Sequence, residues 1–277
     1  DFVGAHLDSP QSDNNPDVVS ADNAHGVHVS GLVSAVTNNG IGIASIANNY
    51  AKVMVVKVGA DDNSTAILSG YEGIKYAVDH GAKVINCSWG GSGNSAFGAD
   101  VVNYAINHDC LIVAAAGNDN VNQPDYPGAY PGVMAVASVS ANDVKSYFSS
   151  YGTQVSIAAP GENILSTLYD NTYAYLSGTS MATPYVAGVA ALMMAANPSL
   201  IGNAREVIRL INETALEAEA RLARIVPADS AAPVRQQGTS LVPQPMPEDS
   251  VRRGLLRDPW RASSRATPSM ADLPVPA

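Results

Sequence analysis

The feature that most constrains the fold of this sequence is an alternation of short apolar runs with segments of helical periodicity. Apolar, often β-branched runs typical of buried strands occur at residues 51–58, 83–88, 111–116, 133–138 and 155–159. Segments that favour helices lie around them, at residues 25–35, 65–80, 96–108, 180–196 and 203–213. This alternation predicts an α/β fold with a mostly parallel sheet covered on both faces and a site at the carboxyl ends of its strands.

Composition divides the chain into two parts. Residues 1–200 contain five Lys, no Arg and 16 acidic residues, whereas residues 201–277 contain ten Arg, no Lys and nine acidic residues. We therefore expect one domain over residues 1–215 and a disordered Pro/Arg-rich extension over residues 216–277. An acidic domain without Arg argues against nucleic acid as a partner. The apolar stretch 182–196 is too short for a membrane span, so no membrane association is expected.

The two cysteines lie near the ends of neighbouring expected strands, Cys87 late in the strand at 83–88 and Cys110 just before the strand at 111–116. Near opposite ends of parallel strands they would lie too far apart for a disulfide bond. We interpret them as buried free thiols.

Four polar residues stand where chemistry is possible. Ser180 precedes a long Ala-rich stretch, and a hydroxyl at a helix N-terminus lies in the positive end of the helix dipole, although a plain N-cap is the simpler interpretation. Asn118 directly follows a buried strand, where its amide could donate to developing negative charge or serve as an ordinary loop residue. His25 and His28 are three residues apart, so a metal site or a structural role is open to each.

Taken together, the motifs around these residues resemble the subtilisin-like (subtilase) serine proteases, in particular their thermitase-like bacterial members. The matching motifs, in chain order, are HGVHVSG at 25–31, NCSWGG at 86–91, AAAGN at 114–118, YPGAYPGVMAVASV at 126–139, FSSYGTQVSIAAPG at 148–161 and SGTSMATPYVAG at 177–188. The resemblance implies a three-layer subtilisin-like fold and a secreted, monomeric serine endopeptidase that acts on polypeptides.

The resemblance also implies a role for each matching residue. Ser180 would be the nucleophile that forms the acyl-enzyme, His25 the general base, and Asn118 the oxyanion-hole donor. Two segments would line the S1 pocket and pair with the substrate backbone, namely Ser88, Trp89, Gly90 and Gly91, and Ala115, Ala116 and Gly117. The small residues leave room for a large side chain, so we expect broad specificity with an apolar P1 preference. The Gly pair is also expected to leave backbone open for strand addition.

The segment 36–43 resembles the calcium loop of the same family. Asn39 would give a side-chain oxygen, and Val36, Ile41 and Ile43 would give backbone carbonyls, a donor set that suits Ca²⁺. A plain Asn-Gly turn is the alternative.

The sequence departs from the family pattern in three places. Val27 replaces the usual Thr beside the base, and Tyr185 replaces the usual His after Thr-Pro. More seriously, no apolar strand ending in Asp-Thr-Gly or Asp-Ser-Gly precedes His25. Asp8 lies too close to His25, and Asp1-Phe2-Val3-Gly4 resembles the stretch that follows that strand.

We therefore expect a fold that lacks the strand carrying the catalytic Asp. An inactive fragment or relic of a protease is the alternative function, and a peptide ligase on the same scaffold is a third that no residue favours.

Overall fold

The computed structural model describes residues 1–4, 12, 14–18, 23–63 and 65–225. Its helices and strands follow in the order α1 (His25–Ser34), α2 (Gly70–Asp79), β1 (Val84–Cys87), α3 (Ala96–Asn107), β2 (Leu111–Ala115), β3 (Met134–Val139), β4 (Val155–Pro160), β5 (Ile164–Thr167), β6 (Tyr173–Leu176), α4 (Thr179–Ala196) and α5 (Ala204–Ile225).

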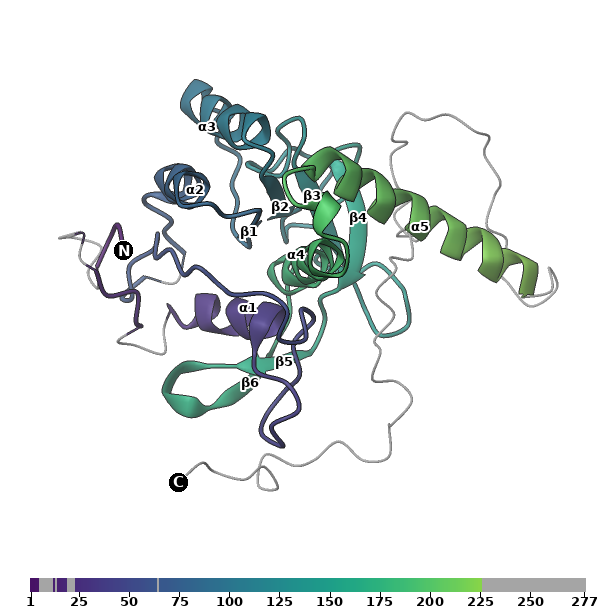
Figure 1. Cartoon of the computed structure of the whole chain (residues 1–277), viewed down its shortest axis with the longest axis horizontal. Coiled ribbons are helices and arrows are strands. Elements are labelled where there is room, and N and C mark those ends of the chain that lie inside the picture. Colours follow the sequence, from purple (N-terminus) through teal and green to yellow (C-terminus); the bar gives the residue numbers. More distant parts are fainter. Residues whose placement is uncertain (5–11, 13, 19–22, 64, 226–277) are drawn as a thin grey trace.

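The predicted parallel sheet is confirmed. Strands β1, β2, β3 and β4 lie side by side in chain order, and every pair is parallel. Strand β2 is buried along its whole length, as expected of an apolar strand with covered faces. Strands β5 and β6 form a separate antiparallel hairpin that packs beneath α1 (Figure 1).

Three layers arise because side chains alternate across the sheet. Leu111 and Val113 of β2 face a core built with α4 and α5. Ile112 and Ala114, the residues between and after them, face a second core built with α2 and α3. Figure 1 shows the two pairs of helices on opposite sides of the strands.

Helix α4 is the central support of the site. It contacts all four strands of the sheet as well as α1. By length and composition, it is the one helix in the described part of the chain that could cross a membrane, and 56% of it is buried inside the protein. More than half of the helix therefore packs inside the protein.

One predicted strand does not form. Residues 51–58 have the apolar pattern of a buried strand, but in the structure they do not form one. Val53, Met54 and Val55 are 41%, 42% and 54% exposed. The physical reason is a missing neighbour, because no backbone hydrogen bond joins residues 53–56 to another described residue. β-Propensity alone cannot hold a strand that has no partner.

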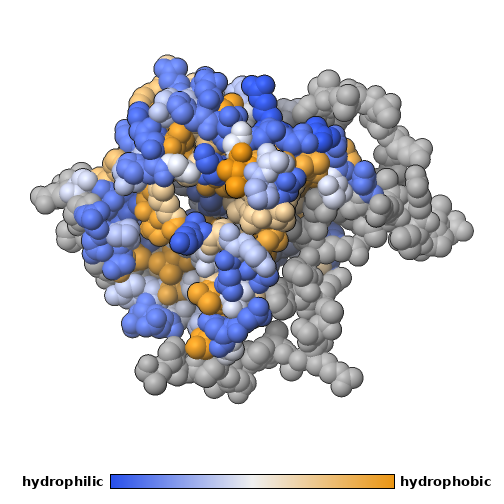
Figure 2. All heavy atoms as spheres, in the orientation of Figure 1, coloured by the Kyte–Doolittle hydropathy of each residue, from blue (hydrophilic) through white to orange (hydrophobic). Residues whose placement is uncertain are grey.

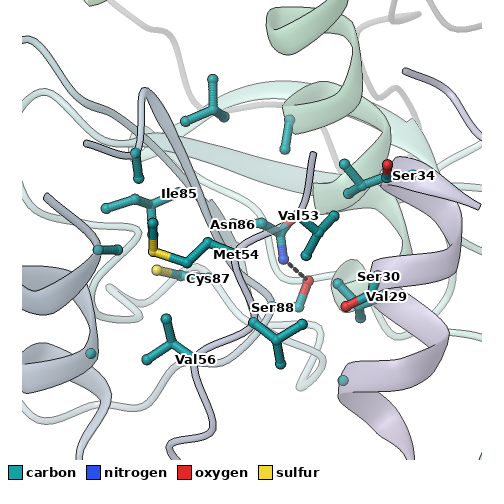
Figure 3. Close-up of a pocket in the computed structure, with 18 of the residues that line it drawn as sticks. Val29, Ser30, Ser34, Val53, Met54, Val56, Ile85, Asn86, Cys87 and Ser88 are labelled. Carbon is teal, nitrogen blue, oxygen red and sulfur yellow. Dashed lines mark hydrogen bonds between the residues drawn. The ribbon is translucent and has the colours of Figure 1, made fainter. Parts of the chain in front are cut away.

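A hollow of about 1130 Å³ separates this segment from β1. Figure 3 shows Val53, Met54 and Val56 on one side and residues of β1 on the other, with α1 along a third side. Figure 2 shows a recess near the centre of this face, with hydrophobic residues around it. Among the described strands the sheet ends at β1, and none of them pairs with the outer edge of β1.

Other boundaries differ from those predicted. The helix expected over 65–80 begins at Gly70, because Asn63 Oδ1 accepts the N–H groups of Thr65 and Ala66 and forms a turn there. Helix α5 continues to Ile225, across the expected domain boundary after residue 215. Residues 226–277 of the expected extension lie outside the described residues. Cys87 and Cys110 are free and buried, as predicted.

Candidate active site

Ser180 is the second residue of α4, at the carboxyl end of the sheet. Its hydroxyl donates to the carbonyl of Ser88 at 3.0 Å, and the Ser88 hydroxyl donates to the carbonyl of Ser180 at 2.8 Å. Residue 178, a Gly, occupies the N-cap position of α4, so Ser180 does not cap the helix. A reciprocal pair of hydrogen bonds thus joins the nucleophile candidate to the segment after β1.

Ser88, which bonds to Ser180, is itself held by Asn86. Asn86 Nδ2 donates to the Ser88 hydroxyl at 2.9 Å, which Figure 3 draws as a dashed line. Ser88 itself is buried. The sequence suggests a substrate-binding role for Ser88, and the structure adds that Ser88 fixes the backbone and side chain of Ser180.

Asn118 lies beside the N-terminus of α4. Its Oδ1 accepts from both the backbone N–H and the hydroxyl of Thr179, at 2.8 and 2.9 Å. Two donors on the oxygen leave the Nδ2 group free to donate elsewhere. A β-carbon at residue 178 would lie 3.6 Å from Nδ2, which places the amide against the turn that leads into Ser180.

His25 is the first residue of α1, which packs against α4. No hydrogen bond joins its ring to another described residue, and the Ser180 hydroxyl is directed to Ser88 instead. Burial, and next the nearby charge of His28, lower the pKa of His25. His25 also lines the hollow beside β1.

His28 has a structural position. It is fully buried, and its Nε2 lies 3.1 Å from the carbonyl of Ile164 and 3.0 Å from that of Ala174. It therefore ties α1 to the β5–β6 hairpin. In the part of the chain that the structure describes, no three His, Cys, Asp or Glu side chains gather where they could hold a metal.

The expected substrate segments lie near these residues, with one correction. The backbone N–H and carbonyl of Gly91 both pair with Tyr126, at 3.0 and 2.8 Å, so the expectation of open backbone at Gly91 is wrong. The Trp89 ring packs edge-on against Tyr71 of α2. Ala115 and Ala116 are buried at the end of β2, and Gly117 follows with a positive φ of 99°.

Asp125 is a site residue that the sequence motifs do not single out. A β-carbon at Gly90 would lie 2.7 Å from its Oδ2, and one at Gly117 would lie 2.9 Å from the same atom. The carboxylate therefore lies between the two expected substrate segments. Burial, and next the charge of Asp119, raise the pKa of Asp125. In the sequence, the one indication that Asp125 could belong to the site is its position just before the Tyr-Pro-Gly of a matching motif.

The expected calcium loop is closed by its own hydrogen bonds. Asn39 Oδ1 accepts from the N–H of Ile41 at 3.0 Å, and Asn49 exchanges two hydrogen bonds with the backbone of Thr37. Val36 and Ile41 are exposed. Residues 36–43 contain no carboxylate, so this loop offers a divalent cation neutral oxygens only.

Comparison with known proteins places this geometry in a family. A model of the Subtilase family matches residues 3–241. Thermitase of Thermoactinomyces vulgaris is 51% identical over 172 residues, which are 62% of this chain and 61% of that protein. The Thermophilic serine proteinase of Bacillus sp. (strain AK1) is 42% identical over 204 residues, 73% of this chain and 49% of that protein.

Solved structures agree. A cold adapted subtilisin-like serine proteinase superposes with a TM-score of 0.63 at 31% identity, over 76% of this chain and 73% of that chain. The chain spans 46–65% of the length of the curated relatives it matches.

Proposed function

The chain belongs to the subtilase family of serine proteases, and from that premise we propose that it carries the nucleophile, base and oxyanion donor of a serine endopeptidase. Ser180 is the nucleophile, His25 the general base and Asn118 the oxyanion donor. The substrates are polypeptides, bound along Ser88, Trp89, Gly90 and Gly91 and along Ala115, Ala116 and Gly117.

One observation carries this proposal. Thr179 holds Asn118 by its Oδ1, and a β-carbon at residue 178 would lie 3.6 Å both from Asn118 Nδ2 and from the backbone N of Ser180 at the start of α4. The first N–H groups of a helix have no partner within the helix. A side-chain amide and a backbone N–H beside one hydroxyl make the donor pair that a tetrahedral oxyanion needs.

The chemistry requires one rearrangement. The Ser180 hydroxyl leaves the Ser88 carbonyl and donates to His25, which takes its proton as Oγ bonds to the scissile carbonyl carbon. The C–N bond then breaks, and His25 gives the proton to the leaving amine. A water molecule hydrolyses the acyl-enzyme by the reverse sequence, with His25 as base. The lowered pKa of His25 keeps the ring neutral and able to accept the proton near neutral pH.

No carboxylate among the described residues hydrogen-bonds to His25. We propose that an additional strand, parallel to β1 and outside the described residues, fills the hollow between β1 and residues 51–58 and brings a carboxylate to His25. The unpaired edges on both sides of the hollow, its valine-rich lining and the position of His25 on it support this proposal.

The alternative function follows from the same hollow. Without a carboxylate partner the His25 ring has no fixed tautomer, and the chain is then an inactive fragment or relic of a protease. In subtilisin, loss of the Asp lowers kcat by a factor of about 3 × 10⁴. The two candidate functions therefore use the same site residues and differ in the rate of hydrolysis.

Covalent labelling tests the proposal. A fluorophosphonate reacts when Ser180 Oγ bonds to phosphorus, fluoride leaves with the P–F bond, and the hydroxyl proton passes to His25. We expect mass spectrometry to place the label on Ser180, and Ser180→Ala and His25→Ala to abolish or strongly slow labelling. Ser177→Ala, three residues earlier, is the matched control. A folded chain that takes up no label on Ser180 contradicts the active-enzyme proposal.

The resemblance to the family supports three further proposals. We propose secretion, a monomeric state and a structural Ca²⁺ held by Val36, Asn39, Ile41 and Ile43. Because these four residues offer neutral oxygens, calcium would also need an anionic ligand from elsewhere. A rise in melting temperature on addition of Ca²⁺, lost in Asn39→Ala, would support the site.

A further inference from the structure

The carboxylate of Asp125 lies between the two expected substrate segments. Its Oδ2 would lie 2.7 Å from a β-carbon at residue 90 and 2.9 Å from one at residue 117, and these two residues belong to different walls. Both walls are glycine at the point of closest approach. A side chain on either residue would therefore displace the acid, and glycine leaves the carboxylate in place.

The loop that carries Asp125 is held firmly against one wall. Its neighbour Tyr126 makes two backbone hydrogen bonds with Gly91, and the carbonyl of Asp125 accepts from the N–H of Ala129 at 2.8 Å. Ser150 lies on the other side, with its hydroxyl 3.2 Å from a β-carbon at Gly117. The position of the carboxylate is thus set by the backbone around it.

The charge of Asp125 is not neutralised within the described chain. No salt bridge to its carboxylate forms among the described residues, and the cationic side chains that do form salt bridges lie on other acids. A second acid, Asp119, is close enough to disfavour ionisation of Asp125. A half-buried carboxylate beside another negative charge is stabilised by an incoming cation.

We propose that Asp125 is a specificity-determining residue that makes the site select a long basic P1 side chain, lysine or arginine, over an apolar one of the same length. This inference rests on the proposed function, because it takes the segments around Gly90 and Gly117 as the S1 walls. It replaces the apolar P1 preference expected from the small wall residues: these residues give room, and Asp125 sets the chemistry at the far end. An acid at the base of an S1 pocket is a known way to select basic P1 residues.

The experiment compares two covalent probes that differ by one charge. Peptidyl diphenyl phosphonates with P1 lysine or P1 norleucine have similar chain lengths, and each reacts by forming a bond from Ser180 Oγ to phosphorus with loss of phenol. We expect the full chain to react about tenfold or more faster with the lysine probe, since hydrogen bonds to charged groups contribute about 1.5–3 kcal/mol. In Asp125→Asn the ratio should fall to about one or below.

The ratio of the two rates within each protein cancels any change in overall reactivity. Asp109→Asn is the matched control, because it removes the same charge from an exposed residue just before β2, at the amino end of the strands and therefore at the end of the sheet opposite the site. We expect Asp109→Asn to keep the ratio of the unsubstituted chain. The preference should also fall at low pH as Asp125 is protonated.

A lysine-to-norleucine ratio near one, or a high ratio that Asp125→Asn leaves unchanged, would overturn the inference. If Ser180 takes up neither these probes nor the fluorophosphonate, the proposed function fails, and the inference is then decided by equilibrium binding. Ser180→Ala would be titrated with the matching P1-lysine and P1-norleucine peptides by calorimetry. About tenfold tighter binding of the lysine peptide supports the role of Asp125, and equal affinities refute it.

Discussion

Gly31→Ala tests how closely α1, which carries His25, must approach the β5–β6 hairpin. A β-carbon at residue 31 would overlap Thr167 Oγ1 and lie 2.5 Å from Ser166 Oγ. These hydroxyls donate to the α1 carbonyls of Val27 and His28, at 3.2 and 2.7 Å. The new methyl group therefore competes with both contacts that fasten the first turns of α1.

The magnitude follows from three contributions. Overpacking costs about 1–3 kcal/mol, and two lost hydrogen bonds cost about 1 kcal/mol each. Replacing Gly by Ala inside a helix returns about 1 kcal/mol. The free energy of unfolding should fall by about 2–4 kcal/mol, which lowers the melting temperature by roughly 2–4 °C for each kcal/mol in a domain of this size.

Gly26→Ala is the matched control in the same helix. A β-carbon at residue 26 meets no atom within 4 Å, so only the gain in helix propensity remains and stability should rise slightly. Urea unfolding followed by circular dichroism measures both variants, and fluorophosphonate labelling reports whether His25 has moved. If Gly31→Ala is as stable as Gly26→Ala, the close approach of α1 to β5 is refuted.

Three other predictions follow from the site. Because burial lowers the pKa values of His25 and His28, the unfolded chain binds more protons, so the free energy of unfolding should fall as pH drops below about 6.5; equal urea midpoints at pH 7.5 and 5.5 would contradict this. Burial raises the pKa of Cys110 to about 12 and that of Cys87 still higher, so both thiols should react with Ellman's reagent only on unfolding, and prompt reaction of the native chain would disprove it. Asn118→Ala should slow acylation of Ser180 by about 10²–10³, the loss known for this donor in subtilisin, while Asn142→Ala, in an exposed turn, should not; equal rates for the two variants would show that Asn118 is not an oxyanion-hole donor.

The parallel sheet is predictable because its strands are buried on both faces and therefore have continuous apolar runs. Strand β2 is the clearest case, since all five of its residues are buried. Residues 51–58 have the same pattern, yet they form no strand. The two segments differ in their neighbours. A run of valines predicts that a segment can be buried in a sheet, but it does not predict whether a partner strand lies beside that segment.

Motifs locate the site residues but not their contacts. The sequence places Ser180 at the start of a helix and Asn118 just after a buried strand, and the structure has both residues in these positions. It cannot reveal that Ser88 holds both the hydroxyl and the carbonyl of Ser180, because 92 residues separate the two. Asp125 escapes sequence motifs for the same reason, since its carboxylate is defined by walls that come from two other segments of the chain.

The pKa of His25 connects the hollow to the chemistry. Burial is the largest influence on the ring and acts to lower the pKa, with no described carboxylate to oppose it. A carboxylate within hydrogen-bond distance would stabilise the imidazolium and act in the opposite direction. It would also fix which ring nitrogen carries the proton, leaving the other to accept from Ser180. A strand that fills the hollow would therefore extend the sheet, orient the base and raise its pKa together, because all three depend on the edge of β1 that no described strand pairs with.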